Sequence, residues 1–102
     1  MPQYIYLIHE REFINSNENV YKVGRTTQPQ FKRLNQYPKG SLLLFHMICN
    51  NSSNIERLVL KKFKEIFTQK KDIGREYFEG DHKTMISILF EVINNEEEHE
   101  DD

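Results

Sequence analysis

Cysteine is almost absent from this sequence, and long apolar runs are missing altogether. Because Cys49 is the single cysteine, an internal disulfide framework and a CxxC metal site are excluded, which fits a reducing compartment. No apolar run approaches the roughly 20 residues that a membrane-spanning helix needs, and the first residues lack the basic and then apolar order of a signal peptide. We therefore expect a soluble, intracellular protein of the cytoplasm or nucleus that is neither secreted nor bound to a membrane.

The chain also lacks an acidic excess outside its last residues, although its net charge is −2. Six acids fall within residues 96–102, and without them 14 basic and 10 acidic residues remain, a net charge of +4. A mildly basic body is compatible with nucleic-acid binding. Because the last seven residues show no apolar periodicity, we predict a single domain over residues 1–95 and an acidic, disordered tail over residues 96–102. The alternative is a tail that mimics phosphate and competes for a basic face.

Three segments have the composition of strands. Residues 3–9 (QYIYLIH) are rich in aromatic and β-branched side chains. The turn residues 15–19 (NSNEN) separate them from a returning strand at residues 20–24. The most apolar run, residues 41–50 (SLLLFHMICN), has apolar side chains on both faces, so we expect a central strand that is covered on both sides.

Helix signals separate and follow these strands. Pro29 suits the first position of a helix to about Gln36, and Asn50 to Ser53 (NNSS) starts a second helix with apolar residues at helical spacing. A last helix follows Asp81, and its core-facing residues are predicted to be Met85, Ile86, Leu89, Phe90 and Ile93. The order β-β-α-β-α-α predicts an α+β fold, with a small three-stranded, mainly antiparallel sheet flanked by helices.

The stretch Val20–Leu34 (VYKVGRTTQPQFKRL) joins a strand, a glycine bend, a turn and the first turn of a helix. It places Arg25, Lys32 and Arg33 close to the bend at Gly24. Cations around a glycine bend make a surface suited to holding a phosphate.

Five pieces of the sequence, taken in order, resemble the GIY-YIG nuclease superfamily, and most closely its short phage- and virus-associated branch with a KIGRT-type second motif. The first is Tyr4-Ile5-Tyr6 in place of GIY, and the second is Lys22 to Thr26 (KVGRT) in place of KIGRT. Arg33-Leu34 is similar to the helix Arg-Leu, one residue later than the commonest spacing. Glu56 begins the acidic helix signature, and Gly74 to Phe78 (GREYF) resembles the closing element. The resemblance covers roughly residues 3–81.

The resemblance implies hydrolysis of DNA phosphodiester bonds at one divalent metal ion, Mg²⁺ or Mn²⁺. It implies Glu56 as the metal ligand, Arg33 on an oxygen of the scissile phosphate, and Tyr6 as the group that orients or deprotonates the attacking water. The catalytic candidates are Tyr6, Lys22, Arg25, Arg33 and Glu56. The candidates for nucleic-acid binding are Lys22, Arg25, Lys32 and Arg33. DNA is the expected partner, and double-strand cleavage would need a dimer.

One departure from the family pattern and one competing structural role leave other interpretations open. Lys22 stands where better-studied members have a second tyrosine, and an ammonium only donates hydrogen bonds. Tyr21 cannot replace that tyrosine, because neighbouring residues of a strand face opposite sides. Ser53-x-x-Glu56 also reads as a capping box, in which the glutamate bonds back to the backbone of the cap residue, and this role and metal binding need not exclude each other. The chain is therefore a metal-dependent nuclease, a nucleic-acid-binding module without turnover, or a small protein-interaction domain with an acidic tail.

Overall fold

The sheet is antiparallel throughout and joins segments that lie far apart in the chain. This computed structural model describes residues 1–28, 32 and 34–100, the last four as backbone only. Five strands lie in the order β3-β1-β2-β5-β4, and neighbouring strands run antiparallel. Their bounds are β1 Gln3–His9, β2 Val20–Thr26, β3 Leu42–Cys49, β4 Thr68–Gln69 and β5 Tyr77–Glu79. The predicted α+β class is confirmed, but the prediction of three strands is wrong. Strands of two and three residues are too short for alternation to reveal them.

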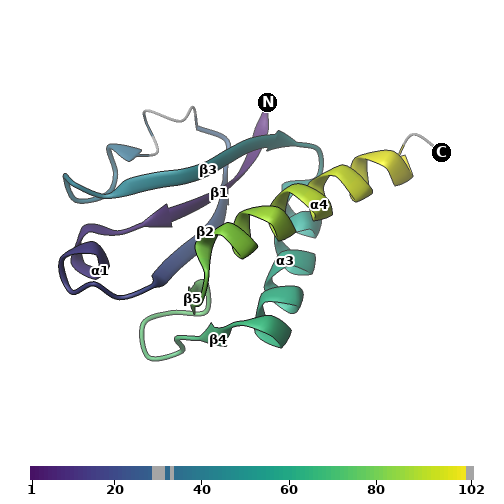
Figure 1. Cartoon of the computed structure of the whole chain (residues 1–102). Helices are drawn as coiled ribbons and strands as arrows, with labels where there is room; N and C mark the ends of the chain where they lie inside the picture. The colour runs from purple at the N-terminus through teal and green to yellow at the C-terminus, as the bar shows by residue number, and fades with distance from the viewer. Residues whose placement is uncertain (29–31, 33, 101–102) are drawn as a thin grey trace.

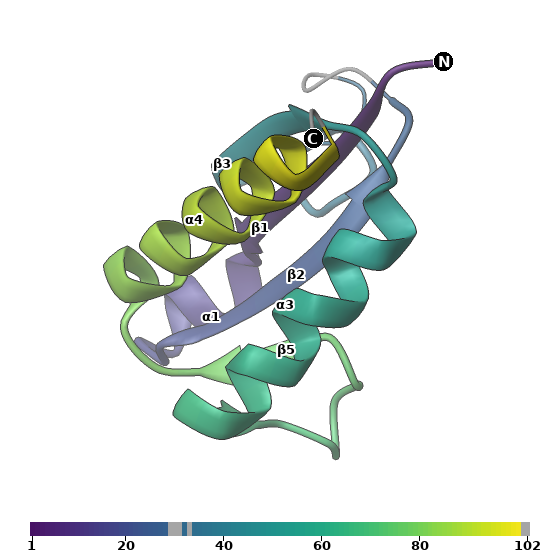
Figure 2. The ribbon, with the colours of Figure 1, turned by 90° about the vertical axis from the view of Figure 1, so that its right-hand side faces the viewer.

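Two long helices, α3 (Ser52–Ile66) and α4 (His82–Glu100), cover one face of the sheet (Figures 1 and 2). Alternate residues of β1 and β2, such as Ile5, Leu7 and Val23, point into the core between this face and the helices. The helices contribute fully buried side chains to the same core: Ile55, Val59, Phe63, Met85, Leu89 and Ile93. Phe90 was predicted to face the core, but it is 52% exposed.

The position of β3 differs from the prediction. It was expected in the centre of the sheet, covered on both sides, but it is an edge strand that pairs with β1. Leu42 and Ile48 are consequently 53% and 58% exposed. Helix α4 contacts β3, so apolar residues on both faces of the strand do not require that both faces are covered.

The connections hold two further differences. A short helix, α1 (Arg11–Asn15), lies in the predicted loop between β1 and β2, and five residues are too few for helical periodicity to show. Helix α4 continues to Glu100, so residues 96–100 are helical rather than part of a disordered tail. Asp101 and Asp102 lie outside the described residues. Of the helix expected at residues 29–36, residues 29–31 and 33 also lie outside them, while Lys32 and Leu34 are helical. No helix in the described part of the chain is long and apolar enough to cross a membrane.

The packing of Phe63 yields a stability prediction. Its side chain is fully buried and meets the rings of Phe67 and Phe78 edge-on. Phe63→Ala should lower the free energy of unfolding by about 3–5 kcal/mol, because the truncation removes buried apolar area and leaves a cavity. Chemical denaturation measures this value. The control Phe90→Ala, at a half-exposed ring, should cost less than about 1 kcal/mol. Equal losses at the two positions would contradict the assignment of the core.

Candidate active site

A cavity opens beside β2 at the point where its pairing with β5 ends. Strand β5 pairs with Val20 to Lys22 of β2, and the carbonyl of Glu76 accepts a hydrogen bond of 3.0 Å from the Val23 N–H. Beyond this point lies a cavity of about 510 Å³. Its lining comes from β1, β2, the turn after β2, the start of α3 and the residue before β5: Tyr6, Lys22, Arg25, Thr26, Thr27, Gln28, Ser52, Glu56 and Glu76.

The cavity collects side chains from both faces of the sheet. Val23 and Tyr21 point into the helix-covered core, so Lys22 and Gly24, their neighbours on β2, share the opposite face with Tyr6. Arg25 lies on the helix-covered side, where α3 brings Glu56. The two groups meet around the open edge of β2, which explains how a strand residue and a helix residue from different layers line one cavity.

Tyr6 reaches the cavity by crossing over Gly24. The two residues are directly opposite each other in the β1–β2 register, and a Cβ atom added at Gly24 would lie 2.5 Å from the Tyr6 hydroxyl oxygen. Only glycine leaves room for the ring at this position. The Tyr6 hydroxyl then lies 3.1 Å from that of Tyr37, so one donates a hydrogen bond to the other.

Lys22 lies among tyrosine rings. Its Nζ is 5.3 Å from the centroid of the Tyr37 ring and 5.9 Å from that of Tyr77, distances at which a cation is attracted to the face of a ring. Glu56 forms an ion pair with Arg25 and not with Lys22. The distance between Arg25 Nε and Glu56 Oε1 is 3.8 Å. Lys22 therefore stands beside the Tyr6–Tyr37 pair.

Glu56 does not take part in the predicted capping box. Helix α3 begins at Ser52, and its N-cap is Asn51, whose side chain accepts a hydrogen bond from the Asn54 N–H. Ser53 thus lies inside the helix, and Glu56 falls beyond the positions that a box can use. The predicted capping-box role of Glu56 is therefore wrong. The Glu56 side chain is 18% exposed, and its carboxylate faces the cavity.

The charges around Glu56 do not neutralise it fully. Burial raises the pKa of Glu56 above its ordinary value of 4.5, and the nearby carboxylate of Glu76 raises this pKa further. Arg25, Arg75 and Lys22 lower it, but by less than these two causes raise it. Two carboxylates thus share one cavity, and the site favours either a proton or an added cation.

The predicted residues are brought together in part. Tyr6, Lys22, Arg25 and Glu56 line the cavity. Lys32 is exposed and is not among the lining residues, and Arg33 lies outside the described residues. Tyr21 is buried in the core with its hydroxyl 3.3 Å from His82 Nδ1, so it does not replace the missing second tyrosine.

Two residues of the site were missed by the sequence analysis. Glu76 belongs to the GREYF motif, which was noted without a role for its carboxylate. Tyr37, which follows the helix predicted to end at about Gln36, was given no role. Its contact with Tyr6 joins residues 31 positions apart, a separation that periodicity does not detect.

The donors in the cavity fit a hard divalent cation that keeps most of its waters. In the part of the chain that the structure describes, no group of three or more His, Cys, Asp or Glu residues could hold a metal ion. Glu56 and Glu76 nevertheless offer carboxylate oxygens to one cavity. Mg²⁺ is commonly bound through one or two carboxylates, with water and substrate phosphate as its other ligands.

The close approach at Gly24 leads to a prediction. Gly24→Ala should displace the Tyr6 ring and break its contact with Tyr37, at a cost of about 1–3 kcal/mol in the free energy of unfolding. Thermal and chemical denaturation measure the cost. Gly74→Ala is the control, because a Cβ atom there would approach only the edge of the Tyr77 ring, at 3.1 Å. If the Gly24→Ala protein were as stable as the wild type, the close packing of the Tyr6 ring against Gly24 would be contradicted.

The raised pKa of Glu56 predicts how stability depends on pH. The folded protein holds the carboxyl proton more tightly than the unfolded chain, so ionisation of Glu56 destabilises the fold as pH rises through the folded-state pKa. Without metal, Glu56→Gln should therefore unfold at a higher temperature than the wild type at pH 7. The difference should disappear below pH 4.5, where both states of the wild type are protonated.

Thermal unfolding at a series of pH values measures this difference. The control is Glu91→Gln, which changes an exposed glutamate of α4. If Glu56→Gln were less stable than the wild type at pH 7, the pairing with Arg25 would outweigh burial and the repulsion from Glu76.

Comparison with known proteins adds one finding. The family model of the T5orf172 domain matches residues 3–93. No curated protein and no solved structure matches the chain.

Proposed function

The chain belongs to the T5orf172 domain family, a phage-associated, nuclease-like domain, and from this premise we propose that it is a divalent-metal-dependent DNA endonuclease of the GIY-YIG type. The observation that carries the proposal is the convergence of Tyr6, Arg25 and Glu56 on one cavity. The three residues come from β1, β2 and α3. A phenol can orient the attacking water, a guanidinium can bind a phosphate and a carboxylate can hold a divalent metal ion.

Each group has a task that follows from its position. The Tyr6 hydroxyl, which shares a hydrogen bond of 3.1 Å with the Tyr37 hydroxyl, would form a hydrogen bond with the attacking water and aim it at phosphorus. Arg25 and Lys22 donate to the non-bridging oxygens of the scissile phosphate. Water forms the new P–O bond as the bond between phosphorus and the leaving oxygen breaks, and the proton that the water loses passes through solvent to the leaving oxygen.

Glu56 would hold the metal, with Glu76 nearby. A bound divalent cation would supply positive charge that neutralises the charge developing on the leaving oxygen. The raised pKa of Glu56 supports this assignment, because it reflects a carboxylate whose negative charge is incompletely balanced by the protein. Arg33, for which the family resemblance implies phosphate binding, stays part of this proposal.

A nicking assay on supercoiled plasmid tests the function. Wild-type protein with Mg²⁺ or Mn²⁺ should relax the plasmid, and chelation of the metal should stop the reaction. Glu56→Gln should abolish the response to metal, and Tyr6→Phe should slow the reaction by about 10²–10⁴-fold. The matched control Glu91→Gln should cleave like the wild type, since residue 91 is an exposed position of α4.

The second candidate is a nucleic-acid-binding module of the same fold without turnover. Lys22 in place of the second tyrosine favours it, as does the pairing of Arg25 with Glu56 at 3.8 Å, which holds a cation against the proposed metal ligand. Salt-sensitive binding of DNA without metal-dependent cleavage would establish this candidate. Absence of both cleavage and binding would leave the protein-interaction domain.

A further inference from the structure

Two further depressions continue from the cavity along α3. The first, of about 630 Å³, shares Glu56 with the cavity and passes over Leu60 to Lys64 and Arg75. The second, of about 490 Å³, shares Lys64 and Arg75 with the first and ends at Lys71. We call this continuous surface the α3 groove. It begins at the proposed metal ligand and runs towards the C-terminal end of α3.

The walls of the α3 groove are strongly basic. Its five cations come from α3 and from the loop between β4 and β5: Arg57, Lys61, Lys64, Lys71 and Arg75. Away from the site, Glu65 is the one carboxylate among its described lining residues. Among the described residues, none of these five cations forms an ion pair. The ion pair found there joins Arg25 to Glu56. The groove therefore keeps a net positive charge.

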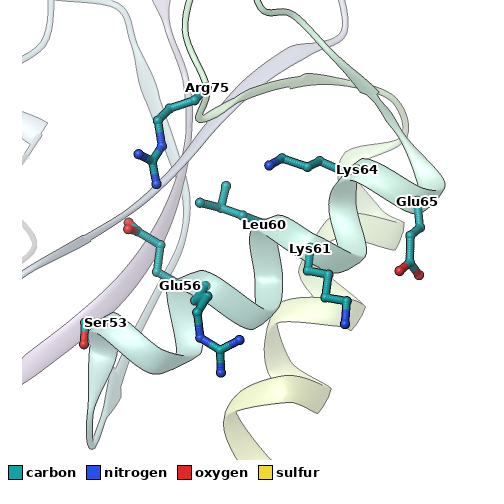
Figure 3. Close-up of a pocket in the computed structure, with 8 residues that line it drawn as sticks. Ser53, Glu56, Leu60, Lys61, Lys64, Glu65 and Arg75 are labelled. Carbon is teal, nitrogen blue, oxygen red and sulfur yellow. The ribbon is translucent and has the colours of Figure 1, made fainter.

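Two of the cations, Lys64 and Arg75, extend over the hollow from different elements, whereas Lys61 points away from Arg75 (Figure 3). Residues 57, 61 and 64 are spaced by four and three positions, which puts them on one face of the helix. Figure 3 shows Arg75 reaching towards Glu56 from the opposite wall, with Lys64 extending over the same hollow and Leu60 between them. Arg75 also lowers the pKa of Glu56, so its charge acts at the site itself.

We propose that the α3 groove binds the phosphate backbone of nucleic acid on one side of the scissile phosphate. This proposal rests on the proposed function, because the end of the groove at Glu56 is taken as the position of the scissile phosphate. From residue 56 to residue 64 the helix rises about 12 Å, at about 1.5 Å per residue. A strand of duplex DNA advances about 3.4 Å per nucleotide along the duplex axis, so a helix segment of this length lying along the axis spans three to four phosphates of one strand.

The same helix carries a cation that separates this proposal from general surface charge. Lys62 is not among the lining residues of the groove. It lies in a neighbouring depression with Leu58, Val92, Asn95 and Glu96, and the groove residues Lys61 and Glu65 line the edge that the two depressions share. The three lysines of the control set are exposed, as are those of the groove set. The control set is Lys39, Lys62 and Lys83, and the groove set is Lys61, Lys64 and Lys71. Triple alanine variants of the two sets therefore remove the same charge from different places.

Binding to a fluorescein-labelled 20-base-pair duplex, measured by anisotropy in EDTA over a range of KCl concentrations, tests the proposal. The groove variant Lys61→Ala/Lys64→Ala/Lys71→Ala should bind at least tenfold more weakly than the wild type. Its slope of log affinity against log salt should fall by about 0.9 for each phosphate that the variant no longer neutralises. The control variant Lys39→Ala/Lys62→Ala/Lys83→Ala should stay within twofold of the wild type, and thermal unfolding checks that both variants are folded.

The outcomes distinguish a failure of the proposed groove from a failure of the proposed nuclease activity. If DNA binding is weakened equally in both variants, or in neither, the proposed groove is wrong even if the wild type cleaves plasmid. Selective loss of DNA binding in the groove variant would support the groove even if no protein cleaves. Where the wild type does cleave, shortening the substrate on one side of the nick should slow cleavage more than shortening it on the other. Equal effects on the two sides would contradict the one-sided groove.

Discussion

The crossing of the Tyr6 ring over the backbone of Gly24 is the contact on which the site depends. It carries a side chain from β1 to the open edge of β2, where a residue of the helix layer can meet it. A methyl group at position 24 would occupy the space of the hydroxyl. Glycine here serves the close approach of a neighbouring ring, rather than an unusual backbone angle.

The open edge itself follows from the length of β5. Three residues of β5 pair with the first residues of β2, so the later residues of β2 are left to line the cavity. Helix α3 then serves two purposes with different faces. Ile55, Val59 and Phe63 pack into the core, while Glu56 and the cations that follow it line the cavity and the α3 groove. One amphipathic helix thus secures the sheet and presents charge along its exposed side.

The electrostatics of the site are unfavourable to the isolated protein. Glu56 is partly buried beside Glu76, and the surrounding cations lower its pKa by less than burial and Glu76 raise it. Such an arrangement costs stability and is typical of sites that act on a ligand. Because Asn51 caps α3, the Glu56 carboxylate is not part of the cap and lines the cavity instead.

The sequence by itself determined the local features of this protein. Alternation and apolar spacing placed β1, β2, α3 and α4, because these patterns depend on residues a few positions apart. The ordered motifs singled out Tyr6, Lys22, Arg25 and Glu56, which the structure brings to one cavity. The tertiary structure alone decided the edge position of β3, the pairing of the short strands β4 and β5, and the entry of Tyr37 and Glu76 into the site. These depend on pairing and packing between distant segments, whose choice rests on the whole core rather than on any local repeat.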